Sequence, residues 1–216
     1  MTSIQRVLLH CIRDNNYHEL MRMVELHHCS QHLLEAFDIN QGTVIHAATK
    51  TGNLSMLKYI LSIALRNLVV WVNLLEIRSV GGYSALHYAC LQDRTDIVEL
   101  LIQSGADPNL SSNGIVSETP LILCCKKGCL RSALVLINSG ADIRKTDSYG
   151  NSPAFWCRKY GHDDMIEKLG LGSPLVPAFE FFLEVLKTRN NGMYQLPKVK
   201  PKKKKGGKDD KKNKKK

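Results

Sequence analysis

Three cysteines and two lysines stand together in the stretch CCKKGC, which runs from Cys124 to Cys129. Thiols at such short spacing could bind a soft metal ion such as zinc. A lysine beside an exposed thiol could instead lower the pKa of that thiol and make it reactive. A third alternative is that the thiols fill the protein interior, where free cysteine is common. The choice depends on the elements that position these side chains.

The remaining residue patterns do not point to an enzyme. We find no Ser/His/Asp set and no paired carboxylates in a shared context. The glycine-rich stretch Gly81–Ser84 lacks the lysine and the spacing of a phosphate-binding loop. We therefore expect a non-catalytic protein that has no cofactor and no metal site.

A repeated pattern organises most of the chain. Ser84–Asn109 aligns with Thr119–Arg144 at a shift of 35 residues, and the tetrapeptide SGAD recurs in register in both. Further copies are Val7–Glu25, which is weaker, Thr43–Leu61 and Ser152–Gly170. One such unit cannot bury its apolar face alone, so the copies must stack.

Each copy predicts a helix, a tight turn, a second helix and a loop. Thr119 followed by Pro120 indicates a helix start, because the hydroxyl caps free N–H groups and proline suits the first turn. Gly128 is expected to end that helix in the left-handed conformation. In the Ser84 copy the second helix is predicted over Thr95–Ser104, with its apolar residues on one face.

This pattern resembles the ankyrin repeat. The family's first-helix motif, Thr-Pro-Leu-His-x-Ala-Ala, is similar to ALHYAC and TPLILCC here, and its loop motif is similar to SGADPN and SGADI. The resemblance covers about Ser3 to Leu171. It implies that the histidine position, held by His46, His87 and His10, ties neighbouring loops together by hydrogen bonds.

The resemblance implies an all-α fold, namely an α-solenoid of about five ankyrin-type helix-turn-helix repeats over residues 1–171. The first copy is expected to be degenerate or to act as a cap. Asp93 and Asn16 stand where glycine usually ends the first helix, while Ile122 and Phe155 replace the histidine. Residues 172–192 are expected to form a C-terminal capping helix, and residues 193–216 a disordered lysine-rich tail.

The cysteines fall on the alanine positions of the repeat. Cys124 and Cys125 take both positions in the fourth copy, and Cys90 and Cys157 take one each in their own copies. Adjacent helical residues point about 100° apart, which does not suit a shared tetrahedral ion. Buried packing is therefore favoured over a reactive thiol or a metal site.

Two segments interrupt the repeat. The apolar stretch Leu65–Ser79, which contains Trp71, either lengthens a helix and packs on its neighbour or forms an apolar finger that contacts a partner. The segment Ser173–Gly192 predicts one more helix with an apolar stripe. That helix either covers the open end of the stack or binds a partner.

The whole net charge of +10 belongs to the last residues of the chain. The basic side chains of this tail are Lys198, Lys200, Lys202, Lys203, Lys204, Lys205, Lys208, Lys211, Lys212, Lys214, Lys215 and Lys216. Repulsion among like charges predicts a disordered segment. Such a tail suits an acidic polymer, either nucleic acid, tubulin tails or anionic lipid, or it is merely solvated.

The predicted function is protein–protein binding as an adaptor, scaffold or assembly subunit, with the tail contacting an acidic partner. The alternatives are a nucleic-acid or ribonucleoprotein-associated factor bound through its tail, and a microtubule or ciliary assembly component. The family binds partners through its loop tips and the concave face of its first helices. Carried over by position, the partner-binding residues are Ile39, Asn40, Lys50, Thr51, Trp71, Val80, Tyr83, Leu91, Gln92, Ile115, Glu118, Lys126, Lys127, Ser148, Tyr149, Asn151, Lys159 and Tyr160.

The sequence also gives an expectation about location. The N-terminal residues lack an apolar core of signal-peptide length, and the most apolar stretch, Tyr59–Ile77, is interrupted by Arg66. Seven cysteines, an odd number, fit a reducing compartment. We expect a cytoplasmic protein, with nuclear or ciliary location as alternatives, that has no transmembrane segment and is monomeric until it binds its partner.

Overall fold

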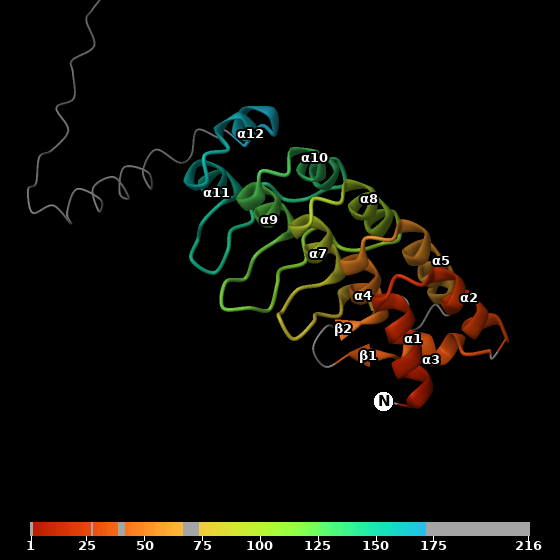
Figure 1. Ribbon diagram of the computed structural model, residues 1–216. Helices are drawn as coiled ribbons and strands as arrows, with labels where there is room; N and C mark the ends of the chain where they lie inside the picture. The colour runs from red at the N-terminus through yellow and green to blue at the C-terminus, as the bar shows by residue number, and fades with distance from the viewer. Residues whose placement is uncertain (1, 27, 39–41, 67–73, 172–216) are drawn as a thin grey trace, which may run out of the picture. The chain divides into compact units, whose positions relative to one another are not determined.

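A computed structural model describes residues 2–26, 28–38, 42–66 and 74–171 of the chain. Within these residues, five pairs of antiparallel helices follow one another along the sequence (Figure 1). The first helices of the pairs, called the inner helices, are α1 (Ser3–Arg13), α4 (Val44–Thr51), α7 (Ala85–Leu91), α9 (Pro120–Lys127) and α11 (Pro153–Lys159). The second helices, called the outer helices, are α2 (Tyr17–Leu26), α5 (Leu54–Leu65), α8 (Thr95–Gln103), α10 (Leu130–Asn138) and α12 (Asp163–Lys168). A short helix, α3 (Ser30–Leu34), follows the first pair.

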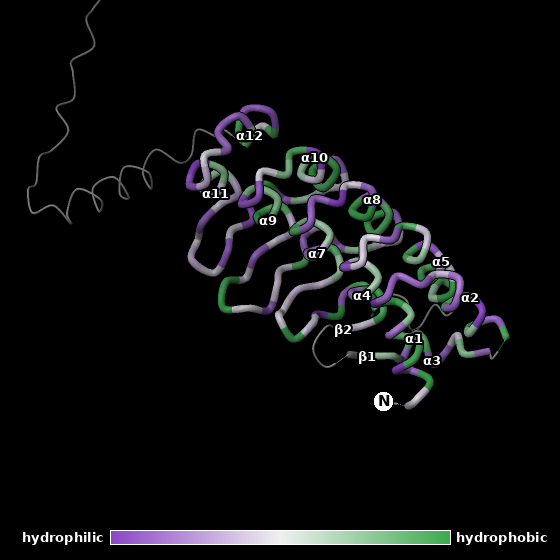
Figure 2. The backbone as a smooth tube through the Cα atoms, in the orientation of Figure 1, coloured by the Kyte–Doolittle hydropathy of each residue, from purple (hydrophilic) through white to green (hydrophobic). Residues whose placement is uncertain are grey.

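Each inner helix packs against the inner helix of the next pair and against its own outer helix. The hydrophobic core is therefore a continuous layer between the two rows of helices. Figure 2 shows that hydrophobic residues are concentrated in the helices, although the tips of the loops that lead into α7 and α9 are also hydrophobic. This layered arrangement confirms the predicted stack of helix pairs.

The loops that join successive pairs are hairpins. The first contains the only two strands among the described residues, β1 (Phe37–Asp38) and β2 (Gly42–Thr43), which pair in antiparallel register. The later three loops are closed by backbone hydrogen bonds from Ser79 to Tyr83, from Ser112 to Glu118 and from Asp147 to Asn151. The fold is thus all-α apart from this two-residue ladder, and none of its described helices is long and apolar enough to cross a membrane.

Local sequence sets the ends of the inner helices. The Thr119 side chain accepts a hydrogen bond from the backbone N–H of Ile122, and Pro120 occupies the first turn of α9, as predicted. Gly128 ends the helix with a φ of 80°, in the left-handed region that glycine enters freely. Asp93 takes the same conformation at the end of α7, with a φ of 53°, in place of glycine.

Two histidines join successive pairs. Nδ1 of His87 lies 2.7 Å from the hydroxyl of Ser84, and Nε2 lies 3.1 Å from the carbonyl oxygen of Glu118 in the next loop. His46 makes the equivalent contacts with Thr43 and with the carbonyl oxygen of Tyr83. Burial lowers the pKa of each of these histidines to about 4, so both imidazoles are neutral at pH 7. The loop-tying role that the resemblance implied is therefore confirmed for both.

The register predicted for the first repeat is wrong by one residue. Asn15, and not Asn16, adopts the left-handed conformation after α1, with a φ of 56°. Asn16 instead accepts a hydrogen bond from the backbone N–H of Glu19 and so caps the next helix. Counting back from Asn15 places the histidine position on the buried Leu9, while His10 is exposed and pairs with Asp14.

Cys124 and Cys125 are buried, as packing in alanine positions requires, and Cys129 after the turn is buried as well. The Cys124 thiol pairs with Cys90 of the preceding inner helix, and the Cys125 thiol pairs with Cys157 of the following one. These thiol hydrogen bonds, together with burial, raise the pKa of both Cys124 and Cys125. Burial also raises the pKa of Cys129 to about 12. The neighbouring lysines therefore do not activate a thiolate here.

Several predicted features fall on residues beyond the described ranges. They include the capping helix, the lysine-rich tail and the central part of Leu65–Ser79 with Trp71. At the edges of that apolar stretch, Leu74 and Leu75 are buried in the core. The described residues all belong to the first of the two units into which the chain divides, and that unit ends at Gly172.

Candidate protein-binding face

The solvent-facing side of the inner helices follows one sequence rule. In the motif Thr-Pro-Leu-His-x-Ala-Ala the x residue lies at the start of this side of the helix, and helical geometry places the residues three and four positions later on the same face. For α7, α9 and α11 the x residues are Tyr88, Leu123 and Trp156. We call this surface, from α4 to α11, the inner face.

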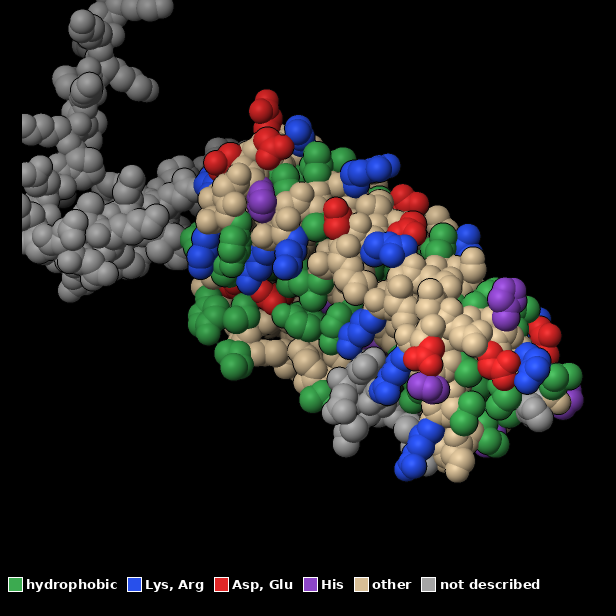
Figure 3. All heavy atoms as spheres, viewed as in Figure 1, with side chains coloured by type: hydrophobic (Ala, Val, Ile, Leu, Met, Phe, Trp, Pro, Cys, Tyr) green, Lys and Arg blue, Asp and Glu red, His purple; other side chains and the backbone are tan. Residues whose placement is uncertain are grey.

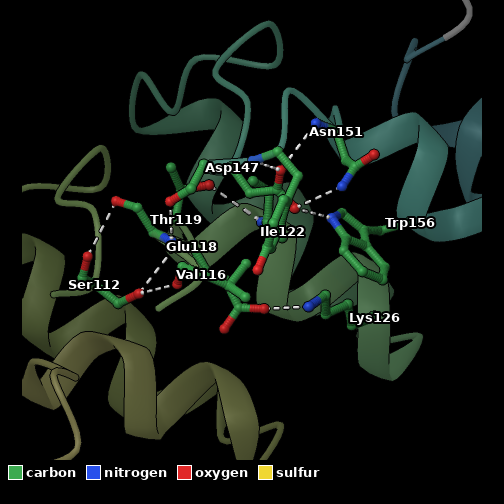
Figure 4. Close-up of polar contacts among 12 residues, drawn as sticks. Ser112, Val116, Glu118, Thr119, Ile122, Lys126, Asp147, Asn151 and Trp156 are labelled. Carbon is green, nitrogen blue, oxygen red and sulfur yellow. Dashed lines mark hydrogen bonds and ion pairs between the residues drawn. The ribbon is translucent and has the colours of Figure 1, made fainter. Parts of the chain in front are cut away.

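A buried carboxylate holds one lysine of the inner face in place (Figure 4). Lys126 of α9 forms an ion pair with Glu118, whose other carboxylate oxygen accepts a hydrogen bond of 2.9 Å from the hydroxyl of Tyr83. The Nζ atom of Lys126 lies 3.6 Å from the ring centroid of Trp156 in the next inner helix, which is a cation–π contact. Burial and the bond to Glu118 raise the pKa of Tyr83 to about 12, so this hydroxyl remains a donor.

A second buried carboxylate fixes the tryptophan. Asp147 accepts hydrogen bonds of 2.9 Å from the indole N–H of Trp156 and from the backbone N–H groups of Tyr149 and Asn151. Burial alone would raise the pKa of Asp147, but the bonds from Asn151, Trp156 and Tyr149 outweigh it, and the net shift is downward. The ionised carboxylate thus ties the last loop to the inner face (Figure 4).

The lysine–aromatic contact recurs at the other end of the inner face. The Nζ atom of Lys50 in α4 lies 4.2 Å from the ring centroid of Tyr88 in α7. As with Lys126 and Trp156, the lysine stands three residues after an x residue and covers the x residue of the next helix. The step between these two contacts is aliphatic, because Leu91 and Leu123 occupy the corresponding positions.

A cavity of about 250 Å³ opens at this aliphatic step. It is lined by Tyr83, Leu91, Glu118, Leu123, Lys126, Lys127 and Tyr160, which come from three successive repeats. Its volume is below the roughly 300–1,000 Å³ typical of small-molecule sites. The cavity therefore suits one large side chain of a partner better than a cofactor.

The loop tips present apolar side chains beside the inner face. Val80 is 72% exposed, Ile115 is 90% exposed and Tyr149 is 64% exposed, and they stand on three consecutive hairpins. Figure 3 shows lysine and arginine side chains gathered over α9 and α11, with hydrophobic side chains on the loop tips below them. Exposed apolar residues repeated in this way are typical of interaction surfaces.

The predicted partner-binding residues differ in how far they are exposed to solvent. Those that are exposed are Val80, Gln92, Ile115, Lys127, Ser148, Tyr149, Lys159 and Tyr160. Those that are half-buried are Lys50, Thr51, Tyr83, Leu91, Lys126 and Asn151, whereas Glu118 is buried and orients Lys126. Ile39, Asn40 and Trp71 lie outside the described residues.

Sequence reasoning missed the x residues themselves. Tyr88, Leu123 and Trp156 line the inner face or support its lysines, yet the prediction named only the residues three and four positions after them. The i, i+3, i+4 rule would have found them, because a helix face contains all three positions.

A larger cavity, of about 450 Å³, lies away from the inner face. It is lined by residues of α2, α3 and α5, among them Glu25, Tyr59 and Arg66. The chain continues from Arg66 into residues beyond the described ranges, so we assign no function to this cavity.

Two family models match the chain. A model of three ankyrin repeats matches residues 8–112, and a model of a single ankyrin repeat matches residues 117–148. The chain is 30% identical to mouse ankyrin repeat domain-containing protein 63 over 126 residues, which is 56% of this chain and 30% of that protein. It is 25% identical to a Caenorhabditis elegans transient receptor potential cation channel subfamily A member 1 homolog over 166 residues, 75% of this chain and 12% of that protein.

The Arabidopsis thaliana E3 ubiquitin-protein ligase KEG is 30% identical over 99 residues, which is 45% of this chain and 6% of the ligase. The chain thus matches less than a third of the length of each of these three proteins. The two family models together cover more than half of the chain, and both describe the repeat that the helix pairs display. The chain belongs to the ankyrin-repeat family.

Proposed function

We propose that this protein is a non-catalytic adaptor or assembly subunit that binds a partner protein through its inner face and loop tips. Ankyrin repeats are generally protein–protein interaction modules, and relatives such as the E3 ligase contain them beside other parts of a much longer chain. The proposed adaptor role for this chain goes further and rests on its own surface.

The observation that supports the proposal most is the cavity between Tyr83 and Tyr160. Its aliphatic and aromatic walls are already held in place by the Glu118–Lys126 pair. A pre-arranged pocket that receives one anchor side chain is typical of the centre of a protein interface. Tyr149 and Ile115 on the adjacent loop tips extend the apolar contact beyond the pocket.

Affinity capture from cells tests this function. The full-length chain is compared with the variant Tyr160→Ala/Ile115→Ser, which removes two exposed apolar side chains from the inner face and a loop tip. We expect at least one protein retained by the original chain to be lost from this variant, because hot-spot residues often contribute more than about 1 kcal/mol each.

The matched control is Leu134→Ser, which removes an exposed apolar side chain from the outer helix α10. It should retain the same proteins as the original chain. If every captured protein is retained equally by both variants, the inner face and the loop tips are not the binding surface and the proposal fails.

A second candidate function concerns the tail. The net charge of the whole protein resides in its last 19 residues, while the rest of the chain is balanced. We propose that the tail adds attraction to an acidic polymer, either nucleic acid, tubulin tails or anionic lipid, and so concentrates the protein near such a surface in the cytoplasm, the nucleus or the cilium. Deletion of residues 198–216 should abolish binding that weakens steeply with added salt. Partner capture through the inner face should survive that deletion.

A further inference from the structure

Three lysines of the inner face have no acidic partner among the residues that the structure describes. Lys50, Lys127 and Lys159 each stand at the C-terminal end of an inner helix, and within the described ranges none of them forms an ion pair. Lys50 and Lys159 lie beside the aromatic rings of Tyr88 and Trp156, which orient their ammonium groups without neutralising them. We call these three residues the lysine row.

The carboxylates near the lysine row interact with groups other than these three lysines. Glu118 is paired with Lys126, and Asp147 accepts hydrogen bonds from the last loop and Trp156. Asp93, in the turn after α7, accepts a hydrogen bond from Ser132 of the outer helix α10. Hydrogen bonds from neutral donors do not neutralise a carboxylate, but in the described part of the inner face the four lysines, at positions 50, 126, 127 and 159, outnumber the three carboxylates of Glu118, Asp147 and Asp93. This leaves an excess of positive charge.

The lysine row brackets the apolar cavity. Lys50 stands one inner helix before the cavity, Lys127 is one of its lining residues, and Lys159 ends the last of the three inner helices around it, next to the lining residue Tyr160. Neighbouring packed helices are about 8–10 Å apart. An extended peptide advances about 3.3 Å per residue. One step along the lysine row therefore corresponds to about three residues of an extended partner.

From this geometry we infer that the partner presents an extended acidic segment, in which a large apolar side chain fills the cavity and carboxylates about three residues apart lie opposite Lys127 and Lys159. A further carboxylate on the other side of the apolar anchor would face Lys50. The inference rests on the proposed function, because it names the chemistry of the segment that the inner face binds.

Two other occupants fit less well. The chain's own lysine-rich tail has the same charge as the lysine row and would be repelled from it. A nucleic-acid strand has a phosphate at every nucleotide, whereas α7 has Leu91 and Gln92 at these positions and contributes no lysine to the row. An acidic peptide with one apolar anchor matches both the charges and the gap between them.

Selection of a phage-displayed library of random 12-residue peptides against the full-length chain tests the inference. The same library is selected against the variant Lys127→Gln/Lys159→Gln. The matched control is Lys58→Gln/Arg131→Gln, which removes two exposed positive charges from the outer helices α5 and α10. Because all three proteins keep the tail, peptides that bind the tail alone enrich equally on each.

Peptides that enrich on the original chain and on the control, but not on Lys127→Gln/Lys159→Gln, are the informative class. We expect them to carry Asp or Glu at a spacing of about three, beside a large apolar residue. Synthetic versions should bind the double variant about 3- to 10-fold more weakly, since two surface ion pairs are lost. A scrambled peptide of the same composition should bind the original chain more weakly than the ordered peptide does, by a similar factor.

Three results would overturn the inference: no peptides in this class, a class without the acidic spacing, or equal binding of ordered and scrambled peptides. A single-stranded oligothymidylate that binds the original chain more tightly than the peptides, and loses affinity with Lys127→Gln/Lys159→Gln, would also overturn it in favour of nucleic acid. If affinity capture still depends on Tyr160 and Ile115, only the inference of an acidic partner segment is contradicted, and the proposed function stands. If that dependence is absent as well, the proposed function fails with it.

Discussion

The two ends of the described stack join their repeats by different chemistry. Between α4 and α9, the neutral imidazoles of His46 and His87 bridge each helix to the carbonyl of the next loop. Between α9 and α11, Ile122 and Phe155 replace the histidine. There the ammonium group of Lys126, which Glu118 orients, contacts the ring of Trp156, which Asp147 holds in place.

The difference shows that some contacts between repeats only stabilise the stack, whereas others also position side chains on its surface. A buried histidine stabilises the stack without presenting a charge, because burial keeps the imidazole neutral. The Glu118 and Asp147 networks also hold loops, but they place Lys126 and Trp156 on the inner face. The second kind of contact therefore builds the surface that we propose for partner binding.

The largest expected effect comes from the carboxylate end. Trp156→Ala removes a nearly buried ring, the indole donor to Asp147 and the surface under Lys126. We expect the free energy of unfolding to fall by about 3–5 kcal/mol. Urea unfolding measures it, with Trp156→Phe as a partner variant that keeps a ring but lacks the N–H. If the free energy of unfolding falls only slightly, and by the same amount, in both variants, the indole does not hold the last loop.

At the histidine end, His87→Ala should reduce the free energy of unfolding by about 2–3 kcal/mol, because two buried hydrogen bonds are lost and the Glu118 carbonyl keeps only the bond from the backbone N–H of Ser112. The matched control is His10→Ala, which should change it by less than about 0.5 kcal/mol, since His10 is exposed. Equal losses in the two variants would contradict the corrected register of the first helix.

The histidines also predict how stability depends on pH. Their pKa is about 4 in the folded state and about 6.5 when unfolded, so between these values the unfolded chain binds more protons. The free energy of unfolding should fall as the pH drops from 6.5 towards 4, by at most about 1.4 kcal/mol per pH unit for each histidine.

His87→Gln offers a test of this pH dependence. Glutamine already fills the corresponding capping position in α1, where Gln5 and Thr2 form a capping box. The variant should keep the cap but unfold with a shallower pH dependence between pH 6.5 and 4 in denaturant titrations. An unchanged pH dependence would mean that His87 does not titrate as its burial requires.

The smallest expected effect concerns an alanine position of α4. Thr49 is fully buried, and its hydroxyl has no hydrogen-bond partner within the described ranges, whereas Cys124 and Cys125 of α9 pair with thiols. Thr49→Ala removes the unsatisfied hydroxyl, which should raise the free energy of unfolding by about 1–3 kcal/mol. It also removes a methyl group, which should lower the free energy of unfolding by about 1 kcal/mol. Thermal unfolding should show unchanged or slightly higher stability. A loss of several kcal/mol would show that the hydroxyl has a partner.

Sequence reasoning predicted the repeats well where local rules decide the structure. Thr119, Pro120 and Gly128 mark the ends of α9, because capping and the left-handed conformation depend on single residues. It failed in the first repeat, since Asn15 and Asn16 suit the turn equally well and only the cap of α2 separates them.

The candidate site was harder to predict. Carrying the family's contact positions over found Tyr83, Lys126 and Tyr160, but it did not reveal that Glu118 is buried and orients Lys126. That arrangement joins residues of three repeats. Its geometry depends on how the repeats stack, which spacing within one repeat does not describe.

Site-specific photo-crosslinking tests the central claim, that the inner face binds a partner protein, most directly. A benzophenone amino acid replaces Lys127 on the inner face or, as the matched position, the exposed Arg131 on the outer helix α10 of the full-length chain. Irradiation in cells should give a discrete protein adduct from position 127 and none of the same mass from position 131. The same adduct from both positions, or adducts from position 131 alone, would contradict the account.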